Sequence, residues 1–202
     1  MSPPDRGADR GSDQRATILA AAISILHERG AGALTVRSVA TLAGCSTTGV
    51  YTWFGGKNGL VEAIFIDGFQ RFGQVLIDVR ARVTPQAAIH ALATAYRDWA
   101  LANPTHYMVM FGGAVPHFEP SPEALVQARS TFTQLVDVAD ETMRRRGIEG
   151  SPEEVAHHLW AGIHGYVSLE LAGMDMTRDA DERQRRFEHG VRLLAKSSLT
   201  AE

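Results

Sequence analysis

Small hydroxyl side chains gather on one stretch of this sequence in a pattern suited to contacting nucleic acid. Residues 35–57, TVRSVATLAGCSTTGVYTWFGGK, hold two short helical patterns on either side of Gly44-Cys45-Ser46. Val50 and Phe54 fall on the inward face of the second pattern, which leaves its small polar residues facing outward. A threonine in the major groove can hydrogen-bond a base edge or place its methyl group against a thymine methyl. The spacing therefore predicts a DNA-reading helix that presents Thr47, Thr48, Gly49 and Thr52.

The residues between the two patterns are those of a tight turn. Gly44 can adopt the left-handed backbone conformation that lets two helices meet at a steep angle, and Ala40 is small enough to keep them close. Thr35 and Ser46 each precede one of the patterns as a candidate N-cap. These residues predict a helix-turn-helix, and an ordinary helical hairpin is the alternative at this point.

A second candidate site lies in the C-terminal half. Trp160 and His164 are four residues apart, so on a helix an aromatic wall and a titratable imidazole share one face. The two side chains could line a ligand cavity, or they could be a core tryptophan beside a hydrogen-bonded core histidine. Met108, Met110 and Phe111 pose the same choice between core filling and an adaptable pocket. Both interpretations stay open.

Enzymatic and metal chemistry find no support in the sequence. His157, His158 and His164 do not form a metal-binding pattern, because adjacent histidines on a helix point about 100° apart and no carboxylate or cysteine completes the set. No nucleophile elbow, phosphate-binding loop, glycine-rich dinucleotide fingerprint or zinc-protease motif occurs. We therefore expect no catalysis, no metal and no cofactor.

The elements that must position these residues are all helical. No segment alternates with the period of a strand, so we expect an all-α fold of nine helices. Residues 1–12 predict a disordered tail, 13–59 a three-helix helix-turn-helix domain, and 60–202 a helical bundle. The helices are expected from Asp13 to Gly30, between Thr35 and Gly44, and over 47–54, 58–79, 85–102, 104–111, 121–146, 152–172 and 180–198.

The composition is that of an ordinary folded protein, with 45% hydrophobic and 21% charged residues over a length of 202. No apolar run approaches the ~18 residues that span a bilayer, and the N-terminus lacks the apolar stretch of a signal peptide. The single cysteine, Cys45, excludes an internal disulfide and fits a reducing compartment, so we expect a cytoplasmic protein with no membrane association. The net charge of −3 argues against indiscriminate polyanion binding, although the stretch up to Lys57 is mildly basic.

The N-terminal pattern resembles the DNA-binding module of the tetracycline-repressor (TetR) family of transcriptional regulators. The resemblance covers about residues 14–65 and rests on Arg15-Ala-Thr-Ile-Leu-Ala-Ala-Ala, Gly30, Thr35-Val-Arg-Ser-Val-Ala, Ala43-Gly-Cys-Ser, Val50-Tyr-Thr-Trp-Phe, and Lys57 with Leu60. It implies a homodimer with one recognition helix per subunit and a C-terminal body that binds a small effector. The DNA-contacting set that follows is Thr35, Arg37, Ser46, Thr47, Thr48, Gly49, Tyr51, Thr52, Trp53 and Lys57.

Within that set the resemblance implies a division of roles. Arg37 matches a residue that can reach a base, whereas Tyr51, Trp53 and Lys57 match positions that donate to phosphate oxygens. Tyr51 and Trp53 could alternatively cover the core of the domain. The sequence also departs from the family pattern in three places. Cys45 replaces the usual valine, Trp53 stands where histidine or tyrosine is common, and Asn58-Gly59 replaces an acidic pair, which is expected to loosen the start of the following helix.

The C-terminal half resembles one subgroup of TetR-family C-terminal domains that carries a Trp…His-Gly signature. The segments concerned are residues 96–104, 107–112 and 160–173. The resemblance implies an effector cavity, and large side chains from separate predicted helices are its candidate lining. The predicted ligand-binding residues are Trp99, Tyr107, Met110, Phe111, Phe132, Trp160 and His164.

Two glycines inside one predicted helix point to close helix packing. Gly162 and Gly165 each cost about 1 kcal/mol of helix propensity relative to alanine, so a neighbouring helix should approach them closely. Together with the last helix they could form a two-fold interface, and packing within one chain is the alternative. The predicted dimer interface is Gly162, Gly165, Tyr166, Leu169, Phe187, Val191 and Leu194.

The function predicted from these observations is that of a ligand-responsive transcriptional regulator. We expect a homodimeric repressor that binds a pseudo-palindromic double-stranded DNA operator and is released by a small, mainly apolar effector. An activator or a co-repressor-dependent regulator would have the same sequence features. The alternative from another functional class is a helical ligand-binding protein or enzyme with a vestigial DNA-binding module. Acidic residues over 47–57 would have favoured that alternative, and none occurs there.

Overall fold

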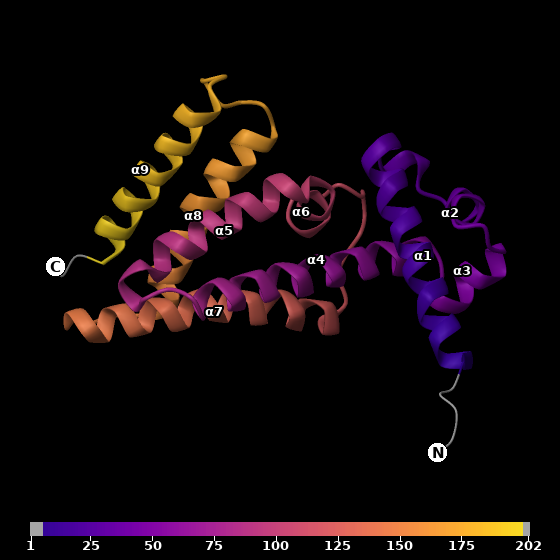
Figure 1. The fold of residues 1–202 in the computed structure, drawn as a ribbon, viewed down its shortest axis with the longest axis horizontal. Helices are drawn as coiled ribbons and strands as arrows, with labels where there is room; N and C mark the ends of the chain where they lie inside the picture. The colour runs from indigo at the N-terminus through magenta and orange to yellow at the C-terminus, as the bar shows by residue number, and fades with distance from the viewer. Residues whose placement is uncertain (1–5, 200–202) are drawn as a thin grey trace, which may run out of the picture. The chain divides into compact units, whose positions relative to one another are not determined.

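The computed structural model describes residues 6–199, which hold nine α-helices, two short 3-10 helices and no β-strand (Figure 1). The predicted all-α fold is confirmed. None of the helices in this described range is long and apolar enough to cross a bilayer. The helices are α1 (Arg6–Arg29), α2 (Val36–Leu42), α3 (Thr47–Phe54), α4 (Lys57–Arg80), α5 (Ala88–Ala102), α6 (Pro104–Met110), α7 (Pro122–Arg146), α8 (Pro152–Leu171) and α9 (Ala180–Ser198), and the 3-10 helices are Ala31–Ala33 and Pro85–Ala87.

The first helix is longer than the sequence predicted. It begins at Arg6 and not at Asp13, so residues 6–12 of the predicted tail are helical. These residues carry no apolar stripe, and hydrophobic periodicity therefore gave no sign of them. Residues 1–5 of the predicted tail lie outside the described residues.

The chain forms two compact units that divide within α4 between residues 68 and 69, and the predicted boundary between residues 59 and 60 lies in the same helix. Unit 1 comprises Met1–Gly68 and Thr105–Leu125, and unit 2 comprises Phe69–Pro104 and Val126–Glu202. The boundary therefore falls inside α4, and most of α6 belongs with unit 1. A continuous helix carries no turn or break in its sequence where its packing partners change, so the helical pattern does not fix the residue at which the boundary falls.

Unit 1 has a core built from the first four helices. Ile18 and Ile25 on α1, Val39 on α2, Val50 on α3 and Leu60 on α4 are fully buried. One apolar residue per helical turn from each element is enough to fix α2 and α3 against α1.

Helix α6 and the loop that follows it are attached to this unit by polar and aromatic contacts. His106 Nε2 lies 3.0 Å from Asp67 Oδ2 on α4, and His27 Nδ1 lies 3.0 Å from Thr105 Oγ1. The rings of Phe65 and Phe118 are 6.0 Å apart.

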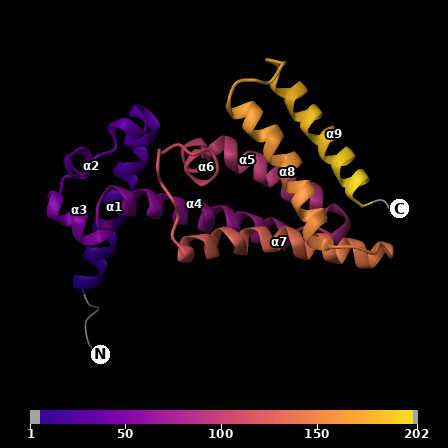
Figure 2. The same ribbon diagram turned by 180° about the vertical axis from the view of Figure 1, so that it is seen from behind.

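Unit 2 is a helical bundle in which α5, α8 and α9 pack on one another and α7 runs beside the second half of α4 (Figures 1 and 2). Its core includes Leu92, Val138, Leu159, Val167 and Val191, which are all nearly or fully buried. The amide nitrogen of Gln134 on α7 donates to the carbonyl of Gly73 on α4 at 3.3 Å.

A network around a buried ion pair joins three helices of unit 2. Arg97 on α5 donates twice to Glu170 on α8, at 2.7 Å from both Nε and Nη2, and the two side chains are 8% and 12% exposed. Arg97 also donates to Gln184 on α9, and Arg183 on α9 donates to Glu170 at 3.2 Å. Because a buried charge left without its partner is strongly destabilising, this network fixes the register of α5, α8 and α9. The sequence pattern gave no sign of it, since Arg97 and Glu170 lie far apart along the chain.

Candidate nucleic-acid interface and ligand-binding core

Two hydroxyl side chains fix where the helices of the helix-turn-helix begin. Thr35 is the N-cap of α2, where its Oγ1 accepts from the Ser38 backbone N–H at 3.0 Å and Ser38 Oγ accepts from the Thr35 N–H at 3.1 Å. Ser46 is the N-cap of α3 and accepts from the Gly49 N–H at 3.1 Å. Both predicted caps are confirmed. Thr35 also donates its hydroxyl proton to Ser38, whereas Ser46 keeps a hydroxyl proton for an outside acceptor.

The turn between α2 and α3 has the predicted left-handed glycine. Gly44 has a φ of 64°, and the next residue, Cys45, donates its backbone N–H to the Ala40 carbonyl at 3.0 Å. Cys45 is half-buried, so it fits where the family usually has a small hydrophobic residue. A second left-handed glycine, Gly55 at φ 68°, ends α3.

Helix α3 presents a polar face to solvent. Val50 and Phe54 are buried as the pattern predicted, and Thr47, Thr48 and Thr52 are exposed. Thr52 donates its hydroxyl to the Thr48 carbonyl at 2.9 Å, which leaves the hydroxyl oxygen as an acceptor. Arg37 is exposed on α2, and Gly49 is partly covered near Gln14 of α1.

The two aromatic residues of α3 are surface residues in unit 1. Tyr51 is 56% exposed and Trp53 is 39% exposed, so neither serves as a core side chain. The Trp53 ring lies against the backbone of α1, where a Cβ built on Gly11 would be 3.3 Å from it. This contact orients the indole while leaving much of it open to solvent.

The start of α4 is fixed by Lys57 and Gly59. Lys57 Nζ donates to the carbonyl of Ala31 at 3.1 Å, so the ammonium ties α4 to the 3-10 helix that follows α1 and keeps two further protons for an outside acceptor. A Cβ at Gly59 would overlap the carbonyl oxygen of Phe54. The helix start is therefore close-packed here, in contrast to the loosening that the Asn58-Gly59 departure was expected to produce.

The predicted ligand-binding residues divide between the two units. Trp99, Phe132, Trp160 and His164 lie in unit 2, where three of them form an aromatic cluster. The Trp160 ring centroid lies 6.0 Å from that of Phe132 and 5.7 Å from that of His164. His164 Nδ1 lies 3.0 Å from the hydroxyl oxygen of Tyr96.

Tyr96 also connects this cluster to Trp99, the other tryptophan among the predicted ligand-binding residues. Tyr96 and Trp99 both contact Phe72, with ring centroids 5.1 Å apart in each pair, Tyr96 edge-to-face and Trp99 tilted. The pKa of His164 is lowered by burial of the imidazole, so the ring is neutral near pH 7 and can donate or accept one hydrogen bond. Tyr96 was not among the predicted ligand-binding residues, and its place three residues before Trp99 on α5 was the signal that could have found it.

The other three predicted ligand-binding residues lie in unit 1. The rings of Tyr107 and Phe111 are in tilted contact, with centroids 5.1 Å apart. Met110 is buried against α4, and its sulfur lies 2.6 Å from where a Cβ on Gly68 would be. Met110 and Phe111 line a small cavity of about 160 Å³ together with Phe65 and Phe118 within unit 1.

The predicted dimer-interface residues also divide, by exposure. Phe187 and Val191 are 3% and 1% exposed, and they pack inside the chain because the apolar stripe of α9 faces α8 and α5. Gly162 accommodates Leu194 of the same chain in the same way. These residues therefore pack within one chain, which is the alternative that the sequence left open.

The other predicted dimer-interface residues contribute to a solvent-facing apolar surface on α8 and α9. Tyr166 and Leu169 on α8 are exposed, and Gly165 faces open space. Leu193 on α9 is 54% exposed, although the sequence prediction did not include it. Tyr166, Leu193 and Leu194 line a shallow groove of about 460 Å³.

Comparison with known proteins places both units in one family. The family model described as "Tetracyclin repressor-like, C-terminal domain" matches residues 89–194, and the model described as "Bacterial regulatory proteins, tetR family" matches residues 18–64. The HTH-type transcriptional regulator Rv1816 of Mycobacterium tuberculosis is 26% identical over 187 residues, which covers 76% of this chain and 80% of that protein.

Solved structures share the fold of this chain. The regulatory protein SCO4313 has a TM-score of 0.78 and 25% identity, and the match covers 94% of this chain and 98% of that one. A protein of unknown function from Rhodococcus sp. RHA1 has a TM-score of 0.77 and 25% identity over 96% of this chain and 100% of that one.

The exposed polar face of α3 and these matches together define a helix-turn-helix transcriptional regulator. The chain belongs to the TetR family of bacterial regulatory proteins. It is a ligand-responsive transcription regulator and not an enzyme, and members of this family bind DNA and dimerise.

Proposed function

We propose that this regulator is a repressor that binds a pseudo-palindromic operator as a homodimer and is released by a small, mainly apolar effector. The observation that supports DNA reading most directly is the exposed face of α3, where Thr47, Thr48 and Thr52 project small groups that fit a major groove. Tyr51, Trp53 and Lys57 flank them with hydroxyl, indole and ammonium donors for phosphate oxygens.

The second copy of the chain is proposed to dock on the apolar surface of α8 and α9. Tyr166, Leu169, Leu193 and Leu194 make this surface, and Gly165 leaves room for close approach. A two-fold axis through it would bring the same residues of both copies into contact, as a self-complementary interface requires.

The effector is proposed to bind at the aromatic cluster around Trp160. The Trp160, Phe132 and Trp99 side chains offer apolar contact, and no lysine or arginine belongs to the predicted set, so the ligand should be mainly apolar. His164 is the polar group that could exchange its Tyr96 partner for the ligand. An effector that binds better to the DNA-incompetent arrangement would lower operator affinity by the same coupling factor. We further propose that the C-terminal part of the chain belongs to the subgroup with the Trp…His-Gly signature, which here is Trp160 and His164-Gly165. Such a regulator would act in the cytoplasm.

The test is selection of bound fragments from genomic DNA with the purified protein, followed by footprinting of a selected fragment. We expect two protected half-sites whose major-groove entries lie about 34–36 Å apart or a multiple of that distance. Protection of an isolated half-site by a monomer would refute the dimeric mode. For the effector, molecules related to the products of neighbouring genes should release the DNA, and Trp160→Ala should respond less; full response by Trp160→Ala would place the effector elsewhere.

A further inference from the structure

A groove in unit 2 lies where the N-terminal end of α5 meets the C-terminal ends of α7 and α9. These three ends lie together in both views of the ribbon (Figures 1 and 2). The groove has a volume of about 690 Å³, within the size range of small-molecule pockets. None of the predicted DNA-contacting or ligand-binding residues lines it. It shares Val191 with the predicted dimer-interface residues, and Lys196 with the groove beside Leu193 and Leu194.

The floor of the groove is apolar and buried. Val191 on α9 is 1% exposed, Leu199 directly after α9 is 5% exposed, and Ile89 on α5 is 7% exposed. Ile148, which follows α7, and Ala195 on α9 extend this surface. A ligand with an apolar part would therefore gain by covering side chains that already form one continuous hydrophobic surface.

The rim of the groove is cationic. Arg146 at the end of α7 and Arg192 and Lys196 on α9 line it, and the described lining residues include no aspartate or glutamate. Neither Arg146 nor Arg192 forms an ion pair within residues 6–199. Guanidinium groups bind carboxylates through two parallel hydrogen bonds, so the rim can accept an anion from outside the chain.

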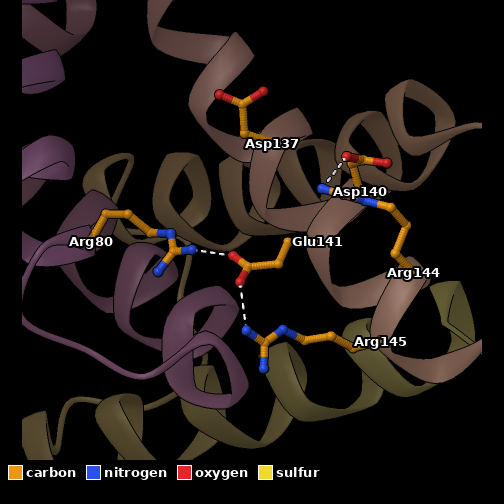
Figure 3. Close-up of a pocket in the computed structure, with 6 residues that line it drawn as sticks. All are labelled: Arg80, Asp137, Asp140, Glu141, Arg144 and Arg145. Carbon is orange, nitrogen blue, oxygen red and sulfur yellow. Dashed lines mark hydrogen bonds and ion pairs between the residues drawn. The ribbon is translucent and has the colours of Figure 1, made fainter.

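A neighbouring pocket on α4 and α7 shows the opposite arrangement (Figure 3). There Arg80 and Arg145 both donate to Glu141, and Arg144 pairs with Asp140 at 2.7 Å. The arginines of that pocket are neutralised by the protein's own carboxylates. Within the run Arg144-Arg145-Arg146, the first two residues are therefore paired at a solvated helix end, whereas Arg146 faces the groove without a counterion among the described residues.

A buried polar atom in the wall of the groove also lacks a partner. His90 on α5 lines the groove, and its Nδ1 is buried without a hydrogen-bond partner among the described residues. Buried polar atoms in folded proteins are nearly always paired, and an imidazole nitrogen can donate or accept according to its tautomer. His90 therefore adds an unpaired polar atom to the residues that line the groove.

We propose that this groove is a second ligand site, which binds a small amphipathic anion: a carboxylate attached to an apolar chain or ring. The carboxylate pairs with the rim cations Arg146 and Arg192, and the apolar part covers Ile89 and Val191. The proposal rests on unit 2 alone and stands independently of the operator and of the effector at Trp160.

Calorimetric titration of the full chain with decanoate tests the proposal, with 1-decanol as the uncharged match. We expect saturable binding of one decanoate per chain and at most weak binding of the alcohol. The double variant Arg146→Gln, Arg192→Gln should bind decanoate with an affinity reduced about tenfold or more, because charge-assisted hydrogen bonds are lost. Both arginines are exposed, so the variant should fold, and circular dichroism checks this.

Two further variants make the test specific. Arg144→Gln removes a paired arginine of the same run and should bind decanoate like the wild type. Ala195→Trp fills the groove and should abolish binding even if the charges remain. Absence of saturable binding, equal binding of the alcohol, undiminished binding by the double variant or an equal loss in Arg144→Gln would each overturn the proposal. If Trp160→Ala abolished decanoate binding and the arginine double variant retained it, the groove proposal would also be overturned. That result would instead support the effector site proposed at Trp160.

Discussion

The hydroxyl oxygen of Tyr96 lies 3.0 Å from Nδ1 of His164, and this contact joins α5 to α8 inside unit 2. The imidazole is also in contact with the Trp160 ring, and burial lowers its pKa. The folded protein therefore holds His164 in its neutral form under conditions in which an exposed histidine begins to take up a proton.

The lowered pKa of His164 predicts a specific loss of stability in acid. When the pKa is lower in the folded than in the unfolded state, the unfolded chain binds more protons, so the free energy of unfolding falls as the pH drops below about 6.5 towards the folded-state pKa. His164→Asn should lose less stability over this interval than the wild type, as measured by urea unfolding at both ends of it. His158→Asn, an exposed position on the same helix, serves as the control and should behave like the wild type. An unchanged pH dependence in His164→Asn would contradict the assignment.

Gly59 should be intolerant of any side chain. A Cβ there overlaps the Phe54 carbonyl oxygen, so Gly59→Ala must shift the backbone at the junction of α3 and α4. Overpacking of this kind costs about 1–3 kcal/mol of unfolding free energy. Gly165→Ala is the matched control, because a Cβ there meets open space within the chain and alanine is favoured by about 0.5–1 kcal/mol in a helix interior. Because Gly165 lies on the proposed dimer surface, both variants are compared at a protein concentration at which the chain is monomeric. Denaturant titrations should move in opposite directions for the two variants, and equal behaviour would show that the close approach at Gly59 relaxes without cost.

Lys57 and Thr48 should affect DNA binding in different ways. Lys57→Ala removes one phosphate contact, so it should weaken binding to all sequences and reduce the salt dependence of log affinity by about one unit. Thr48→Ala should instead lose preference at particular base pairs. Fluorescence anisotropy across a salt series and a panel of operator variants distinguishes these outcomes. Because Lys57 also bonds to Ala31, the stability of the variant is measured alongside. A changed sequence preference in Lys57→Ala with an unchanged salt slope would reverse the assigned roles.

The sequence predicted the local features of the helix-turn-helix because they depend on neighbouring residues. The caps at Thr35 and Ser46 and the left-handed Gly44 follow from side-chain chemistry within a few positions, and the structure has all three. The sequence did not predict the start of α1 at Arg6, because residues 6–12 carry no apolar face that periodicity could detect.

Features that depend on distant residues were beyond the sequence pattern. The Arg97–Glu170 pair joins residues on α5 and α8, and no local periodicity marks either as a buried partner. The stripe of Phe187 and Val191 was correctly recognised as apolar, but periodicity does not say whether the surface that covers it belongs to the same chain. The structure assigns these two residues to the packing of α9 within the chain, and it leaves Leu193 exposed nearby.

Leu193 therefore gives the sharpest test of the proposed dimer. It is 54% exposed on α9 beside Tyr166 and Leu194, so Leu193→Glu should leave the fold intact while placing a charge on each side of the two-fold contact. Sedimentation velocity should show a monomer at concentrations at which the wild type is a dimer. Binding to a full palindrome should weaken strongly, because the two recognition helices are no longer linked, while binding to a single half-site stays the same. Val126→Glu changes a residue that is 60% exposed on α7 and should remain dimeric. A dimeric Leu193→Glu protein with undiminished operator affinity would place the interface on another surface.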